Sequence, residues 1–180
     1  GNYMANMWMH EAGRATWQFN GWATGGAAVH PQFLETYDPD DSRYNECWIE
    51  GPQYDYAGNP IYIENEQLNY SRELHSIDNP GCYPMEGARL IKYEIIGGDF
   101  GTSYDDVPFF RYADVLLMKA ECLLRMGGYN GESEQVAADL VTQVRQRCFK
   151  SNPAKATVTV AQLKGGSKYN YGLRENQGKM

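Results

Sequence analysis

The sequence has no long hydrophobic run, no cysteine pair at metal-binding spacing and no cluster of lysine and arginine. No apolar stretch approaches the ~20 residues that a membrane-spanning helix needs. The 4 cysteines form no CxxC pair, and none lies beside one of the 3 histidines, which argues against a zinc site. The formal net charge of −7 argues against a nucleic-acid-binding protein, because such proteins normally carry a basic face.

The signatures of common catalytic sites are missing as well. There is no Gly-x-Ser-x-Gly elbow, no phosphate-binding loop and no His-Glu-x-x-His. A glycosidase needs two carboxylates that face each other across a cleft. The two acidic residues in an apolar helical setting, Asp114 and Glu121, lie at ion-pair spacing from Arg111 and Arg125. We therefore predict that the chain is not an enzyme and has no catalytic residues.

Aromatic residues, in contrast, are abundant, with 14 Tyr and 4 Trp, and most precede residue 105. Residues 17–26 combine two tryptophans with three glycines. Glycine lets the backbone approach a ligand, and a tryptophan ring offers a flat apolar face on which a sugar ring can stack. The Asn20 amide can bond neighbouring hydroxyls. The alternative is that both tryptophans fill the core beneath a glycine-rich loop.

Residues 44–87 lack a sustained period but hold many tyrosines and prolines. A loop of this length is uncommon unless it is functional or disordered, and its aromatic density argues against disorder. We predict an ordered, tyrosine-rich excursion with a short strand at 61–63, which forms a ligand rim or a partner surface or simply covers the core. The candidate ligand contacts are Trp17, Asn20, Trp22, Trp48, Tyr54 and Tyr56.

Residues 107–127 contain a start signal, an apolar stripe and a stop signal for a helix. Asp105 or Asp106 can cap it, Pro108 suits its first turn, and Gly127-Gly128 ends it. The stripe has helical spacing and predicts a wide buried face. Its members are Phe109, Ala113, Leu116, Leu117, Ala120, Leu123 and Leu124.

A second helix is predicted from a Ser133 cap to Phe149. Its stripe consists of Val136, Ala137, Leu140, Val141, Val144 and Cys148. The short link predicts that the two helices pack antiparallel, as in a tetratricopeptide unit. One such unit cannot bury its own faces, so the hairpin by itself should show an exposed apolar face.

Shorter elements are predicted elsewhere. They are a helix over residues 4–11 that is broken at Gly13, a helix over 31–37 and a strand over 88–96. Cys122 and Cys148 are expected to be small buried hydrophobic residues, whereas pairing of Cys47 with Cys82 stays open.

Asp38, Asp40 and Asp41 form an acidic stretch that can be interpreted in two ways. Carboxylates at alternate positions suit a calcium ion, but Arg43 and Ile49 stand where an EF-hand loop needs glycine and glutamate. A turn held by aspartate side chains, with Arg43 ion-paired to one of the carboxylates, is the preferred interpretation. We predict no cofactor and no metal, with calcium near Asp38–Asp41 as the alternative.

The segment Phe110–Met118, followed by Ala120-Glu121, resembles the most recognisable stretch of the SusD/RagB family. Members of this family are outer-membrane lipoproteins of glycan- and peptide-scavenging bacteria. The short helix that ends at Tyr37, with Asp41-x-Arg43 after it, resembles the family too, and so does the lysine–tyrosine strand before the marker helix. The resemblance covers residues 19–150.

The resemblance implies a mainly α, SusD-like fold: a tetratricopeptide-like helical hairpin, a long loop-rich and aromatic-rich excursion and a few short strands. Within one domain, we expect residues 1–104 to form the ligand face, 105–150 the hairpin and 151–180 an irregular tail. Because the sequence shows no signal peptide or lipobox, we expect a fragment without the lipoprotein signal, the N-terminal repeats and the C-terminal end.

The implied function is non-catalytic capture of an oligosaccharide nutrient at the cell surface and its delivery to a SusC-like TonB-dependent transporter. The protein would be held at the outer membrane by an N-terminal lipid anchor. The alternatives are a peptide-binding member of the same family and a helical-repeat scaffold that binds only proteins.

Overall fold

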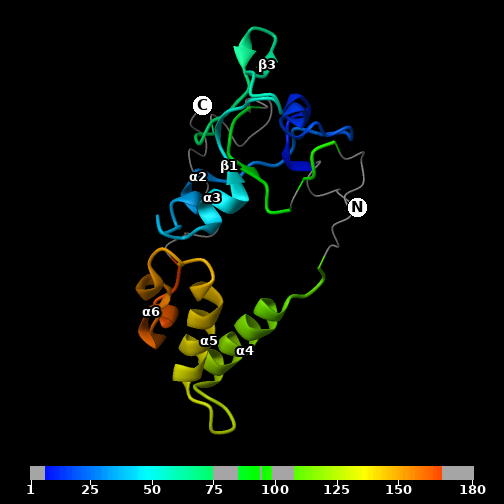
Figure 1. Ribbon diagram of the computed structural model, residues 1–180. Helices are drawn as coiled ribbons and strands as arrows, with labels where there is room; N and C mark the ends of the chain where they lie inside the picture. Colours follow the sequence, from blue (N-terminus) through cyan, green and yellow to red (C-terminus); the bar gives the residue numbers. More distant parts are fainter. Residues whose placement is uncertain (1–6, 75–84, 94, 99–107, 168–180) are drawn as a thin grey trace. The chain divides into compact units, whose positions relative to one another are not determined.

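The computed structural model describes residues 7–74, 85–93, 95–98 and 108–167 (Figure 1). The chain divides into two compact units. Unit 1 comprises residues 1–37, 43–107 and 171–180, and unit 2 comprises residues 38–42 and 108–170. Both helices and strands occur, which is compatible with a mainly helical fold.

Unit 1 is built from short elements. Its helices are η1 (Glu11–Trp17), α2 (Pro31–Leu34) and α3 (Arg43–Cys47). Its strands are β1 (Trp48–Ile49), β2 (Gly51–Pro52), β3 (Tyr62–Ile63), β4 (Glu66–Gln67), β5 (Asn69–Tyr70) and β6 (Arg89–Leu90). They pair antiparallel as β1 with β6, β2 with β5 and β3 with β4. The predicted strand at 61–63 and the predicted helix start at Pro31 are confirmed.

Two predictions for this unit are wrong. The strand predicted over residues 88–96 is limited to β6, because its partner β1 has only two residues and the chain then turns into β2. Gly13 lies inside η1 and does not break it. The predicted ordered excursion over residues 44–87 is confirmed in its described part, which contains α3 and five short strands.

The hydrophobic core of unit 1 consists of small separate clusters. One joins Met9 to Phe19, a second joins Val29, Leu34 and Ala88, and a third joins Ile61, Leu68 and Tyr70. Clusters of this size bury little apolar area. Hydrogen bonds between the segments must therefore fix much of the geometry of the unit.

Unit 2 contains α4 (Tyr112–Met126), α5 (Glu134–Gln146), η2 (Pro153–Ala156) and α6 (Val160–Lys164). Helices α4 and α5 pack around Ala120, Leu123 and Ala137, which confirms a helical hairpin. Gly127 takes the left-handed conformation that ends α4, as predicted. The elements η2 and α6 lie in the segment that was expected to be an irregular tail.

The start of α4 differs from the prediction. The helix begins at Tyr112, so Pro108 lies outside it, and Arg111 occupies the N-cap position. The Arg111 backbone N–H donates to Asp114 Oδ2 at 2.9 Å, and the Arg111 guanidinium bonds the same carboxylate. The Asp114 carboxylate thus gives the Arg111 backbone N–H at the helix end a partner, and its bonds to the guanidinium hold the carboxylate in place. The two predicted caps, at 105 and 106, lie outside the described residues.

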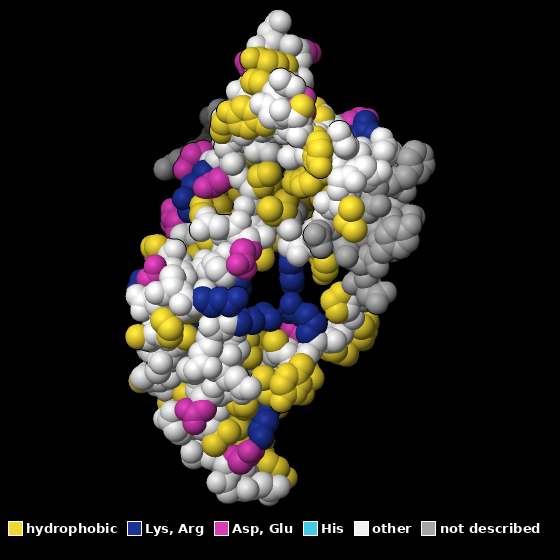
Figure 2. Space-filling view, in the orientation of Figure 1, with side chains coloured by type: hydrophobic (Ala, Val, Ile, Leu, Met, Phe, Trp, Pro, Cys, Tyr) yellow, Lys and Arg dark blue, Asp and Glu magenta, His cyan; other side chains and the backbone are white. Residues whose placement is uncertain are grey.

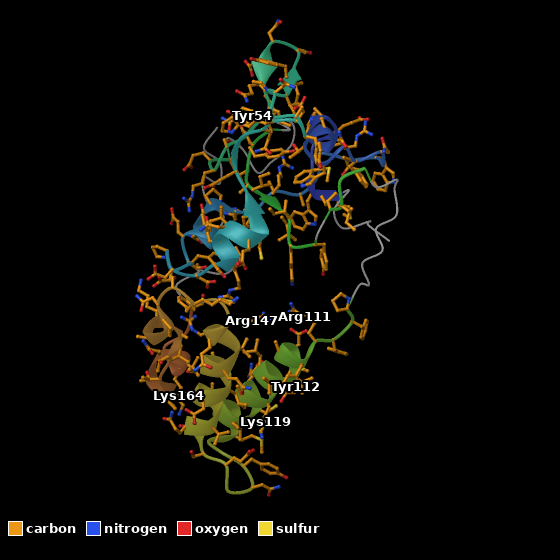
Figure 3. The ribbon with its side chains drawn as sticks, viewed as in Figure 1. Tyr54, Arg111, Tyr112, Lys119, Arg147 and Lys164 are labelled. Carbon is orange, nitrogen blue, oxygen red and sulfur yellow. The ribbon has the colours of Figure 1, made fainter. Side chains whose placement is uncertain are left out.

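The predicted buried face of α4 is only partly buried. Ala120 and Leu123 are buried, but Leu117 is exposed, and Phe109, which precedes the helix, is 90% exposed. Figure 2 shows hydrophobic side chains on the surface along α4, and Figure 3 places Arg111 and Tyr112 at its start. The exposed apolar residues of α4 are Tyr112, Val115, Leu117, Met118 and Met126. The expected exposed apolar face of the hairpin is therefore confirmed.

The acidic turn at residues 38–42 belongs to unit 2. Asp38 Oδ1 accepts the Asp40 N–H at 2.9 Å, so the predicted aspartate-held turn is confirmed. Lys155 Nζ lies 2.9 Å from Asp38 Oδ1 and 2.7 Å from Asp40 Oδ2, and its hydrogen bonds lower the pKa of both carboxyl groups. Within the described residues, no group of three or more His, Cys, Asp or Glu side chains is placed to hold a metal ion.

Two cysteines of unit 2 have different surroundings. Cys148 is buried beside Phe149, as predicted. Cys122 is exposed, which contradicts the prediction, because it lies on the outer side of α4. Both are free thiols. Cys82 lies outside the described residues.

Candidate ligand-binding site

The short helix η1 carries most of the side chains of the candidate site. His10 occupies its N-cap position, and its Nδ1 atom accepts the Ala12 N–H at 3.1 Å. Gln18 ends the helix in the left-handed conformation with φ 51°, and its N–H donates to Ala15 O. Histidine is an unusual cap, which is why the sequence pattern does not reveal where this helix begins.

The position of η1 is fixed by Gly13 and Tyr70. The Tyr70 hydroxyl accepts the His10 backbone N–H at 3.0 Å, and burial raises the pKa of this hydroxyl. A Cβ atom on Gly13 would lie 2.5 Å from Tyr70 Oη. Glycine at position 13 is therefore needed for the close approach of the tyrosine to the helix.

The glycine-rich loop after η1 is wrapped around a buried arginine. Arg89 Nη1 donates to Gly25 O at 2.8 Å, Nη2 to Glu86 O at 3.0 Å and Nε to Gly87 O at 3.1 Å. Its guanidinium also lies over the Tyr70 ring, 5.1 Å from the centroid. One side chain thus joins β6, β5 and the loop that follows η1.

An open depression of about 620 Å³ lies over η1. It is lined by Glu11, Ala12, Arg14, Ala15, Gln18, Phe19, Asn20 and Gly98. The Asn20 amide donates to Gly98 O at 3.2 Å, and the Gly98 N–H donates to Trp17 O at 2.9 Å. These two bonds join the end of η1 to residues 97–98 and close one wall of the depression.

Three of the six predicted contact residues are brought together here. Asn20 lines the depression, the Trp17 carbonyl holds Gly98, and the Tyr56 N–H donates to Ala15 O at 2.9 Å. The Tyr56 side chain is 64% exposed and lies next to Gly97. Its ring therefore lies beside the neighbour of Gly98, a lining residue.

The other three predicted residues do not line the depression. Trp22 is 47% exposed on the loop after Gly21. Trp48 lies in the cluster of Val29 and Leu34, where its Nε1–H donates to Tyr37 Oη at 3.2 Å. Tyr54 is exposed and forms a bridge with Pro60 at the base of the β3–β4 hairpin (Figure 3).

Sequence reasoning missed Glu11, Arg14 and Gln18. Arg14 Nη2 lies 3.0 Å from Glu11 Oε1, and Arg14 Nη1 donates to Gly21 O at 2.6 Å. The spacing of three residues between Glu11 and Arg14 is a signal for a helical ion pair. The sequence contains this spacing, but the spacing indicates an ion pair only if residues 11–14, including Gly13, are helical.

The loop that presents Tyr56 is held by one carboxylate. Asp55 Oδ1 accepts the backbone N–H groups of Ala57 and Asn59 at 2.9 and 2.8 Å, and the Asn59 amide donates to the same carboxylate. These hydrogen bonds lower the pKa of the Asp55 carboxyl group. The Tyr56 ring is thus presented by a turn that keeps its shape at neutral pH.

The cap of η1 predicts a pH-dependent stability. Burial and the nearby Arg89 charge lower the pKa of His10 from its ordinary 6.5. His10 is therefore protonated at a higher pH in the unfolded chain than in the folded chain. The contribution of the neutral His10 cap to the free energy of unfolding is complete above about pH 6.5 and declines as the pH falls below that value. We expect the free energy of unfolding, measured in urea, to fall between about pH 7.5 and about pH 5.5.

The matched control is His10→Asn, since an asparagine side chain can accept the same N–H without titrating. The decline should be smaller in this variant than in the unmodified chain. Equal declines would show that His10 does not contribute.

The model of the SusD family matches residues 1–170, which is most of the chain and extends on both sides of the residues that show the resemblance. The chain belongs to the SusD family. No curated protein and no solved structure matches it. Proteins of the SusD family are nutrient-binding proteins associated with the outer membrane, and they act by binding and not as enzymes. In the described part of the chain, no helix is long and apolar enough to cross a membrane.

Proposed function

We propose that this SusD-family chain binds an oligosaccharide nutrient in the depression over η1. The observation that carries the proposal is the lining of the depression, where two amides and a charged pair lie beside the small apolar side chains of Ala12 and Ala15. Sugar recognition combines hydrogen bonds to hydroxyls with apolar contact to the ring face. An open depression suits part of a long glycan, because the rest of the glycan can extend into solvent.

Aromatic rings near the depression supply the stacking surface in this proposal. The Tyr56 ring beside Gly97 is exposed, and Trp22 is exposed on the adjoining loop. Trp17 supports the wall through its carbonyl oxygen. Trp48 and Tyr54 stay weaker candidates, because neither lines the depression.

The proposal includes the cellular setting that the family suggests. The protein is held at the cell surface by a lipid anchor and delivers the glycan to a SusC-like TonB-dependent transporter in the outer membrane. The α4–α5 hairpin serves as one unit of a tetratricopeptide-like array. The exposed apolar residues of α4 support this role, because such units need neighbours to cover their faces.

A glycan array followed by calorimetry tests the binding proposal. Asn20→Ala is expected to weaken glycan binding about tenfold, because it removes the amide's hydrogen bond to the ligand and its bond to Gly98 O in the wall. The matched control is Asn45→Ala, because Asn45 is an exposed amide on α3 that does not line the depression. It should leave the affinity unchanged. Binding of peptides without any glycan would favour the peptide-binding alternative and overturn the proposal.

A further inference from the structure

The charged pair in the depression is rigidly held. Arg14 uses Nε to donate to Glu11 O at 3.1 Å, Nη1 to donate to Gly21 O and Nη2 to bond Glu11 Oε1. A guanidinium that is anchored at three nitrogens has a fixed plane. The Glu11 carboxylate lies beside it, with Oε1 3.0 Å from Arg14 Nη2, and its side chain is 69% exposed. Donors and acceptors therefore stand side by side in a defined orientation.

The pair also sets the charge of the depression. Among the eight lining residues, Glu11 and Arg14 are the two that carry charge, and their charges cancel. A carboxylate on a ligand would meet a guanidinium that already has a carboxylate partner, and it would be repelled by Glu11. The depression therefore offers no net attraction to an anionic ligand.

A vicinal diol fits this arrangement. Each hydroxyl of a diol both donates and accepts, so it can donate to the Glu11 carboxylate while its neighbour accepts from an Arg14 N–H. Hydrogen bonds to charged groups are stronger than those between neutral groups. The amides of Gln18 and Asn20, which also line the depression, each offer a further hydrogen-bond donor and acceptor.

We propose that the Glu11–Arg14 pair determines the specificity of the site, so that it selects neutral sugars with vicinal diols over sugars that carry a carboxylate. This inference rests on the proposed function, because it assigns the ligand class of the same depression. Glu11 accepts from the diol and repels uronic acids. Arg14 donates to the diol and holds Glu11 in place.

Calorimetry at constant salt with two oligosaccharides of equal length, one neutral and one containing uronic acid, tests this inference. The unmodified chain is expected to bind the neutral sugar more tightly. Glu11→Gln is expected to weaken neutral-sugar binding about tenfold and to strengthen uronate binding, because it removes one charge-assisted hydrogen bond and one repulsive charge. Glu66→Gln, which removes the same charge from β4 outside the depression, is the matched control and should leave the preference unchanged.

The outcomes separate the two claims. A preference that Glu11→Gln does not alter, or an unmodified chain that prefers the uronate, overturns the specificity inference while glycan binding stands. Absence of any sugar binding by the unmodified chain overturns the proposed function, and the inference with it.

Discussion

Replacing Arg89 with methionine is expected to lower the free energy of unfolding of unit 1 by about 3 kcal/mol. The guanidinium donates to the carbonyl oxygens of Gly25, Glu86 and Gly87, and the residue is only 2% exposed. Methionine keeps most of the apolar stem but leaves these carbonyl groups without their donor. Burial lowers the pKa of Arg89, yet an arginine stays charged at any pH at which the protein is folded.

Urea unfolding followed by tryptophan fluorescence measures this effect, since all 4 tryptophans lie in unit 1. The control is Arg125→Met on the exposed side of α4, which should change stability by no more than about 0.5 kcal/mol. If Arg89→Met were as stable as the control, the loop would not depend on the arginine, and other contacts would hold unit 1 together.

Gly13→Ala is expected to destabilise the protein by about 2 kcal/mol, although alanine normally stabilises a helix. Its Cβ would lie 2.5 Å from Tyr70 Oη. The tyrosine cannot move aside easily, because it is buried and its hydroxyl accepts the His10 N–H. The substitution must therefore displace η1 or break that hydrogen bond.

A double-mutant cycle with Tyr70→Phe tests this reason directly. Without the hydroxyl, the nearest ring atom is Tyr70 Cζ at 3.7 Å from the added Cβ, an ordinary contact. In the Tyr70→Phe background, Gly13→Ala should lower the free energy of unfolding by well under half as much as it does in the unmodified chain, as measured by urea unfolding. Additive effects of the two substitutions would contradict the proposed contact.

The sequence predicts best those features that depend on neighbouring residues. The end of α4 at Gly127 and the start of α2 at Pro31 each depend on a residue at the element's own end. The early start predicted for α4 is wrong because the Arg111–Asp114 pairing begins the helix later than the apparent proline signal. Local signals compete, and the sequence does not show which one is used.

Features that depend on distant residues are not predictable in this way. Arg89 looks like one polar residue in an apolar strand, and its role depends on carbonyl groups more than 60 positions earlier in the chain. Gly13 looks like a helix breaker because its partner, Tyr70, is far away in sequence. The composition of residues 17–26 did indicate the region of the candidate site, but the Glu11–Arg14 wall lies in the preceding segment.

The depression over η1 is where we expect the ligand to bind. The most direct measurement is a titration of the isotope-labelled chain with its best-binding oligosaccharide, followed by amide chemical shifts in NMR spectra. We expect the amide signals of Ala15, Gln18, Asn20 and Gly98 to shift together with one saturation curve, and those of α5 to stay unchanged. Shifts confined to α4 and α5, with none around η1, would contradict the claim.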